Sequence, residues 1–239
     1  ARGVAADAAL HRAFDTLLGS HGMVPLDEAT VDRTISSAAP AADHPARVFL
    51  LDAALADAAE GGSAGADLLY ASRGLRATSL ADLRRAKEQA ERTGRLGEEF
   101  VHDHLQRLQH AGSLQSFDWV SDRIPLSPFD FTLSVAPATG VLLDVKSTRG
   151  EYGRVLHVSF GELRTMAGSA ARYDLYRVFE MTETRAKLRV ATDVRGYAAG
   201  ILAVLSRLPQ GVTPDSLSFD PDQFGFDAEV FDLTLADDE

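Results

Sequence analysis

The segment GVLLDVKSTRG, residues 140–150, decides how the sequence is interpreted. It begins as a buried strand, with Val141, Leu142 and Leu143 in succession, and then places Asp144 and Lys146 two residues apart. Because side chains alternate along a strand, the two charged side chains lie on one face. They form either a solvated ion pair on an outer face of a sheet or part of a metal-dependent active site.

The preceding segment FDFTLSV (129–135) is joined to this strand by APATG, whose proline and glycine favour a short turn. We therefore predict a β-hairpin. Pairing centred on the turn places Asp130 opposite Lys146 and Thr132 opposite Asp144. In this register Asp130, Asp144 and Lys146 share one face. The other face carries the apolar side chains Phe129, Phe131, Leu133, Val135, Leu143 and Val145.

Two neighbouring carboxylates repel each other and both stay ionised readily only if a cation lies between them. Oxygen ligands of this kind suit Mg²⁺ or Mn²⁺. A nearby lysine can orient an attacking water or offset charge developing on phosphorus. Asp130, Asp144 and Lys146 therefore predict metal-assisted phosphodiester hydrolysis. An acidic residue two positions before a lysine arises easily by chance, so the strand context and the second aspartate carry the prediction and the ion-pair interpretation stays open.

Composition limits the function classes. The chain of 239 residues has no cysteine, which excludes disulfides and thiolate metal sites and is typical of a reducing cytoplasm. No apolar run approaches the roughly 18 residues needed to span a bilayer, so we expect no membrane segment. The net charge of −11 argues against tight nonspecific binding to nucleic acid. Residues 70–210 nevertheless carry 20 basic and 16 acidic side chains, so this part is mildly basic.

The pattern along the chain predicts an Ala-rich, mostly helical segment over 1–75 and an α/β (α+β) domain over 76–239, with a mixed sheet flanked by helices. One helix is expected from Ser79 to Arg92 and, after a break at its glycines, a second from Leu96 to His110. The remaining expected helices are 160–171 and 197–207. Strands are expected at 117–120, 129–135, 141–147, 154–159, 173–181 and 186–192, with an edge strand within 226–235. Ser159 and Glu162 have the spacing of a capping box, which gives Glu162 a structural role.

Four motifs, in this order, resemble the PD-(D/E)xK nuclease superfamily: GEEFV (97–101), PFDF (128–131), DVKST (144–148) and YDLYRVF (173–179). More narrowly, they resemble the "protein NO VEIN C-terminal" domain family, which occurs in larger bacterial proteins of antiviral defence and restriction. The resemblance covers about residues 90–235. It implies a restriction-endonuclease-like core, a Mg²⁺-dependent endonuclease activity, and DNA rather than RNA as substrate.

The resemblance also assigns residues. Asp130 matches the aspartate of the "PD" motif, although Phe129 separates it from the proline here. Asp144 and Lys146 match the acidic position and the lysine of the second motif, and Glu98 matches the glutamate supplied by the first helix, with Glu99 as an alternative. Asp130, Asp144 and Glu98 would then hold the metal.

Contacts with nucleic acid are expected after the DVKST strand. Arg149 and Arg154 flank the following loop and are candidates for phosphate contacts, as is Ser147, although solvation of these arginines and a strand-ending role for the serine are alternatives. We expect the chain to be part of a larger cytoplasmic polypeptide or defence complex, with a homodimer as a further possibility. The competing hypothesis is a catalytically silent module on the same fold that binds nucleic acid or a protein.

Overall fold

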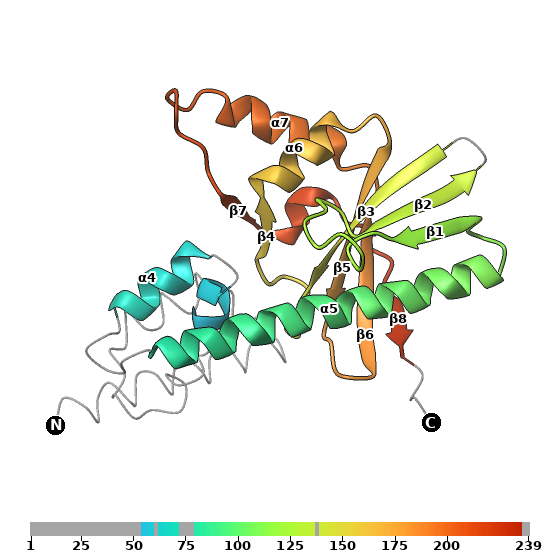
Figure 1. Cartoon of the computed structure of the whole chain (residues 1–239), viewed down its shortest axis with the longest axis horizontal. Coiled ribbons are helices and arrows are strands. Elements are labelled where there is room, and N and C mark those ends of the chain that lie inside the picture. The colour runs from blue at the N-terminus through green and yellow to red at the C-terminus, as the bar shows by residue number, and fades with distance from the viewer. Residues whose placement is uncertain (1–53, 60–61, 72–78, 137–138, 236–239) are drawn as a thin grey trace. The chain divides into compact units, whose positions relative to one another are not determined.

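The computed structural model describes residues 54–59, 62–71, 79–136 and 139–235 (Figure 1). The helices predicted before residue 54 lie outside these ranges. Compactness divides the chain into units 1–90 and 91–239, whereas our predicted boundary at 75/76 falls outside the described residues. In the first unit, residues 54–59 and α4 (Ser63–Ala71) are helical. Helix α5 (Leu80–His110) begins in this unit and continues into the second.

The second unit is built on a mixed six-stranded sheet, which confirms the predicted α/β class (Figure 1). Strands β3 and β5 pair in parallel, and all the other neighbours pair antiparallel. In spatial order the strands are β1 (Ser116–Trp119), β2 (Phe131–Ala136), β3 (Thr139–Ser147), β5 (Arg172–Phe179), β6 (Arg185–Ala191) and β8 (Phe231–Thr234). Strands β4 (Leu156–Ser159) and β7 (Ser216–Phe219) form a separate two-stranded sheet.

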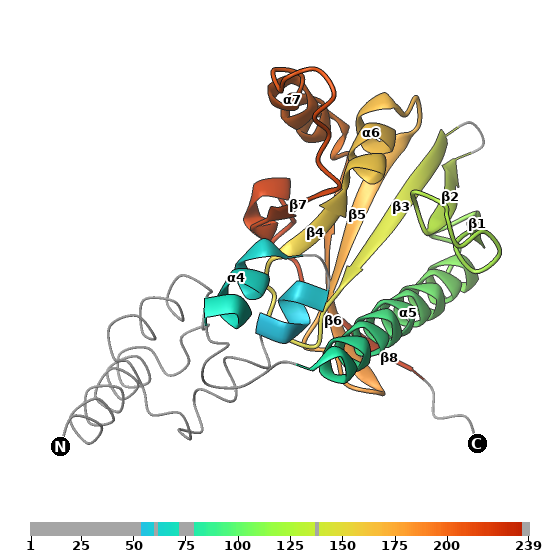
Figure 2. The ribbon, with the colours of Figure 1, turned by 60° about the vertical axis from the view of Figure 1, so that its left-hand side comes forward.

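Two apolar clusters lie on opposite faces of the large sheet. Phe100, Val101 and Leu105 of α5 pack on one face, against β2, β3 and β5. The other face is covered by α6 (Phe160–Gly168), α7 (Arg195–Leu205), the small sheet and the 3₁₀ helix η1 (Pro221–Phe224). Figure 2 shows the sheet between these two groups of elements. Strand β5 is buried on both faces, as expected for a strand with a parallel neighbour and helices on either side.

Helix α5 runs without interruption through the glycines where we predicted a break, so that prediction was wrong. A helical glycine costs only about 1 kcal/mol relative to alanine. At Gly97 the missing side chain has a structural reason, because a Cβ there would lie 1.7 Å from Ser147 Oγ. The glycine therefore lets α5 approach β3 closely, and tertiary packing keeps the segment helical.

The β2–β3 hairpin forms as predicted, but its register differs by two residues. Phe131 pairs with Leu143 and Leu133 with Val141, and the register shifts between Ser134 and Ala136. Since the slip is an even number of residues, the face assignment survives. The predicted partner of Asp130 was wrong, because continuing the observed register places it opposite Asp144, not Lys146.

Two apolar positions depart from the predicted face. Phe129 precedes β2 and packs against the cluster on the α6 side, while Val135 is exposed near the turn. The edge strand predicted within 226–235 is present as the shorter β8, at the end of the sheet. Strand β7 was not predicted, because four residues between turns give too short a pattern to distinguish from a loop.

Candidate functional site

Asp130 is fixed by its backbone and its side chain together. Its N–H donates to the carbonyl of Leu143 at 2.9 Å, and its own carbonyl accepts from the N–H groups of Val120 and Ser121. The carboxylate Oδ2 accepts from the N–H of Val145 at 2.7 Å. The loop between β1 and β2 therefore closes at Asp130, and this aspartate is held directly beside β3.

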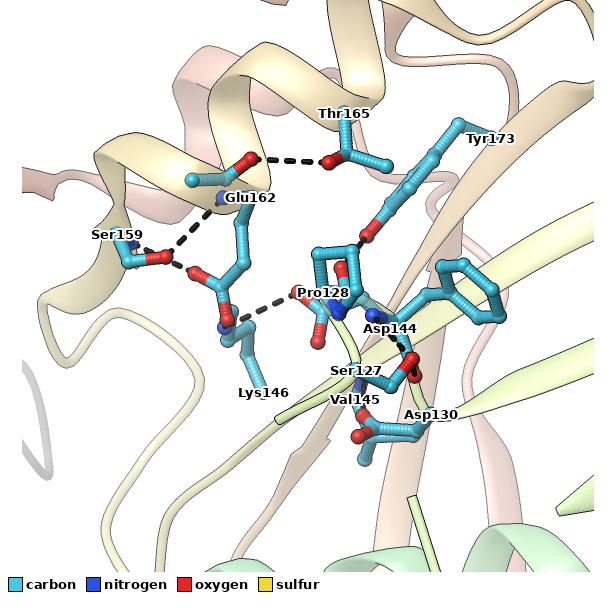
Figure 3. A network of polar contacts seen from close by, with 12 residues as sticks. Ser127, Pro128, Asp130, Asp144, Val145, Lys146, Ser159, Glu162, Thr165 and Tyr173 are labelled. Carbon is cyan, nitrogen blue, oxygen red and sulfur yellow. Dashed lines mark hydrogen bonds and ion pairs between the residues drawn. The ribbon is translucent and has the colours of Figure 1, made fainter. Parts of the chain in front are cut away.

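Asp144, Lys146 and Glu162 form a largely buried charged group on the α6 face of the sheet (Figure 3). Lys146 Nζ lies 3.0 Å from Asp144 Oδ2 and 2.8 Å from Glu162 Oε1. The side chains are only 15% exposed for Lys146, 5% for Asp144 and 21% for Glu162. Of the two interpretations of the Asp144–Lys146 spacing, a solvated outer-face pair is therefore excluded.

The charge balance of the cluster shows in its pKa values. Burial, together with the charges of Asp144 and Glu98, raises the pKa of Asp130 well above its ordinary value. Burial also raises the pKa of Asp144, although Lys146 opposes this effect. The negative charge of Asp144 opposes ionisation of Asp130, so loss of a proton from one carboxyl group is linked to the charge of the other. Burial would lower the pKa of Lys146, but the charges of Asp144 and Glu162 outweigh it and raise this pKa.

Tyr173 and Glu162 make further hydrogen bonds that connect the cluster to the neighbouring backbone. The Tyr173 hydroxyl donates to the carbonyl of Pro128 at 2.6 Å (Figure 3). This bond ties the backbone two residues before Asp130 to strand β5. Burial and the charge of Asp144 raise the pKa of this hydroxyl, so it remains a donor. Glu162 also accepts from the Ser159 N–H at 2.6 Å and completes the predicted capping box of α6. Burial would raise the pKa of Glu162, but Lys146 and the Ser159 N–H hold it below its ordinary value.

The aspartate pair fits a divalent cation. Asp144 Oδ2 is buried beside Asp130 and, apart from its ion pair with Lys146, has no hydrogen-bond partner among the described residues. A cation would neutralise the two carboxylates and favour the ionised form of both. Within the described ranges, no three His, Asp or Glu side chains are grouped so as to hold a metal. Mg²⁺ is commonly held by one or two carboxylates with water and phosphate completing its shell, so a pair suffices for this metal.

Glu98 is held by the β1–β2 region. Its Oε2 accepts from Trp119 Nε1 at 2.8 Å and from Ser121 Oγ at 2.6 Å. Its charge reaches Asp130, whose pKa it helps to raise. Glu99, the alternative, is 43% exposed and pairs with Arg95 one helical turn earlier. Of the two glutamates, Glu98 is thus the one whose charge acts on the candidate site.

The residues predicted to contact nucleic acid have different surroundings. Arg149 is half exposed and pairs with Glu183 at 2.8 Å. Arg154 lies beside Gly150, and its backbone carbonyl accepts from the buried Arg177. Ser147 Oγ is buried against Gly97 of α5 and finds no hydrogen-bond partner in the part of the chain that the structure describes. Ser147 thus supports the helix–strand contact, and contacts of all three predicted residues with phosphate stay predictions.

Sequence reasoning missed four polar partners of the site: the second contact of Glu162, and the roles of Tyr173, Trp119 and Ser121. The capping-box spacing identified Glu162, but its contact with Lys146 joins residues 16 apart in sequence. Only the order of the strands and the start of α6 bring these residues together, and no local pattern encodes that.

The second unit is therefore a mixed α/β domain with a largely buried Asp–Asp–Lys–Glu cluster on the α6 face of its sheet. Comparison with family models, with curated proteins and with solved structures gives no match for this chain. Among the residues placed by the structure, no helix is long and apolar enough to cross a membrane.

Proposed function

We propose that this domain is a metal-dependent nuclease that hydrolyses phosphodiester bonds. The observation that carries the proposal is the buried pair Asp130–Asp144 with Lys146 Nζ 3.0 Å from Asp144 Oδ2. A buried aspartate pair with raised pKa values and an adjacent lysine is costly to fold, which makes it a candidate for chemistry more than for stability.

Each residue has a role in the proposed reaction. Asp130 and Asp144 would hold Mg²⁺ or Mn²⁺, and Glu98 would add negative charge from the α5 side. When bound, the metal would polarise the phosphodiester and promote ionisation of a water molecule. Lys146, held on Asp144, would orient the attacking water and offset charge on the phosphoryl oxygens. Arg149 and Arg154 would contact phosphates near the end of β3.

The test incubates the purified chain with supercoiled plasmid, linear duplex, single-stranded DNA and RNA, in Mg²⁺, Mn²⁺ or EDTA. Asp144→Asn and Lys146→Met are expected to lower metal-dependent cleavage by at least about 100-fold. Matched controls are Asp232→Asn, at an exposed position of β8, and Lys187→Met, whose lysine is 42% exposed and pairs with Glu180. Both controls should cleave like the wild type.

Three outcomes would reject the proposal: cleavage unaffected by EDTA, cleavage that survives both site variants, or cleavage lost equally in the controls. Absence of cleavage on all four substrates would instead favour the catalytically silent binding module. One observation supports this second candidate. Lys146 is already paired with two carboxylates, which an unreactive core cluster would also show. A silent module predicts that Asp144→Asn still binds the same nucleic acid or partner as the wild type.

The wider setting rests on the sequence resemblance. It favours DNA over RNA, a cytoplasmic location, and a role as one module of a larger protein of bacterial defence or DNA processing. The net charge of −11, counted over the whole chain, is consistent with reliance on other parts of such a protein for nonspecific affinity. The substrate panel above tests the first of these points directly.

A further inference from the structure

Glu162, at the start of α6, uses its two carboxylate oxygens for different contacts. Oε2 accepts from the backbone N–H of Ser159 at 2.6 Å, and the Ser159 hydroxyl accepts from the Glu162 N–H at 3.1 Å. Oε1 lies 2.8 Å from Lys146 Nζ (Figure 3). The group that fixes the first turn of α6 therefore also contacts the lysine of the candidate site.

The contact confines the ammonium group of Lys146. A lysine side chain has four rotatable bonds and normally places a strongly hydrated charge in water. Here Nζ lies between Asp144 on one side and Glu162 on the other, with the lysine side chain only 15% exposed. Two carboxylates from two different elements fix the position of the ammonium group, whereas Asp144 alone would leave it free to rotate about that contact.

Capping alone does not require a charge at position 162. A glutamine at this position of a capping box also reaches back to the N-cap N–H group. The side chain at position 162 is only 21% exposed. Placing a carboxylate there costs more hydration free energy than placing an amide, unless an opposite charge compensates for it. The charge is matched by Lys146, so the substitution Glu162→Gln separates the two functions of this side chain.

We propose that Glu162 is a positioning residue, which holds Lys146 against Asp144 and thereby ties α6 to the catalytic strand β3. The consequence for cleavage rests on the nuclease function proposed above. The restraint of the Lys146 side chain by Glu162 does not depend on that function, and it can be measured without any substrate.

The experiment uses the fact that the chain contains only three lysines, Lys87, Lys146 and Lys187. The full chain is treated briefly with an amine-acylating reagent at constant pH, and modification of each lysine is followed by peptide mass spectrometry. In the wild type, Lys146 should react roughly tenfold more slowly than Lys187, because it is buried and held on both sides. In Glu162→Gln, Lys146 should react several-fold faster while Lys187 is unchanged.

The matched control is Glu180→Gln, which removes the partner of Lys187 in an exposed pair of similar length, 2.7 Å. It should leave the reactivity of Lys146 unchanged and alter that of Lys187 less than twofold, because exposed pairs hold their partners weakly. The melting temperature of Glu162→Gln should stay closer to the wild type than that of Glu162→Ala, which also loses the cap.

In cleavage assays, Glu162→Gln should lower kcat by roughly tenfold with KM changed less than twofold, as for a residue that orients a catalytic group. Unchanged Lys146 reactivity in Glu162→Gln would overturn the proposal, as would a larger loss in KM than in kcat. If the wild type cleaves no substrate, the nuclease function fails, and the acylation result still decides whether Glu162 holds Lys146.

Discussion

The close contact between α5 and β3 at Gly97 leads to a prediction that the structure defines quantitatively. An alanine Cβ at this position would lie 1.7 Å from Ser147 Oγ and 2.6 Å from Ser147 Cβ. Rotation about χ1 can move the hydroxyl away, but it cannot move Cβ, which is fixed to the backbone of the strand. Helix or strand must therefore shift by several tenths of an ångström or more.

The expected cost follows from two opposing effects. Overpacking of a well-packed interface costs about 1–3 kcal/mol, and a contact this short belongs at the upper end. Replacing a helical glycine by alanine recovers about 1 kcal/mol of helix propensity. We therefore expect Gly97→Ala to lower the free energy of unfolding by about 2 kcal/mol. A Cβ added at Gly94, one turn earlier, would meet no atom of the described residues within 4 Å, so Gly94→Ala should raise the free energy of unfolding by about 1 kcal/mol.

Urea unfolding followed by fluorescence provides the assay. The chain has one tryptophan, Trp119, which bonds to Glu98 and stacks beneath Arg95 of α5. Its emission therefore reports on the unit that contains the helix–sheet contact, independently of residues before it. The two glycine variants should shift the urea midpoint in opposite directions with an unchanged slope.

The double variant Gly97→Ala/Ser147→Gly tests the physical cause. Removing both Ser147 side-chain atoms removes the clash, so the two substitutions should couple favourably by about 1–2 kcal/mol. If Gly97→Ala is as stable as Gly94→Ala, or if the double variant shows no coupling, the close approach of α5 to β3 is refuted.

Three further outcomes are expected around the carboxylate pair. The raised pKa of Asp130 means that the folded state binds a proton at this carboxyl group more tightly than the unfolded state. The stability that this protonation contributes is complete below the ordinary pKa of 3.8 and is lost as pH rises through the raised value. The metal-free melting temperature should therefore fall between pH 5 and pH 8 more in the wild type than in Asp130→Asn. Mg²⁺ or Mn²⁺ at 100 times its dissociation constant should stabilise the chain by about 2.7 kcal/mol, more strongly at alkaline pH because the ligands must be ionised, and calorimetric titration should show no such binding in Asp144→Asn. Lys146→Met leaves the Asp144 charge buried without its partner and should cost about 3 kcal/mol in urea unfolding, part of which Asp144→Asn restores in the double variant; full additivity would contradict the buried pair.

The alternation of side chains along a strand predicted which residues share one face of the hairpin, and an even error in the register does not change that prediction. The hairpin register was two residues off, and an even slip keeps Asp130, Asp144 and Lys146 on one face. The same slip decides which residue lies opposite Asp130. The observed register also shifts between Ser134 and Ala136, near the turn, and the turn sequence does not specify such an irregularity.

The predicted break in α5 failed for a related reason. Glycine lowers helix propensity wherever it occurs, but Gly97 serves a contact with a residue 50 positions later. A single sequence presents the two uses of glycine identically. Only the position of Ser147 against the helix distinguishes a glycine that permits packing from one that ends a helix.

Glu162 shows most clearly why the sequence yields a site residue without its function. The capping-box spacing correctly assigned it to the first turn of α6, and that local role accounts for one of its carboxylate oxygens. The other oxygen meets Lys146 because β3 and the start of α6 lie side by side in the folded sheet. A structural assignment was therefore correct and incomplete at once. An amide could also complete this cap, so a carboxylate that is largely shielded from water at this position implies a second partner of opposite charge. Of the three lysines in the chain, Lys146 is that partner.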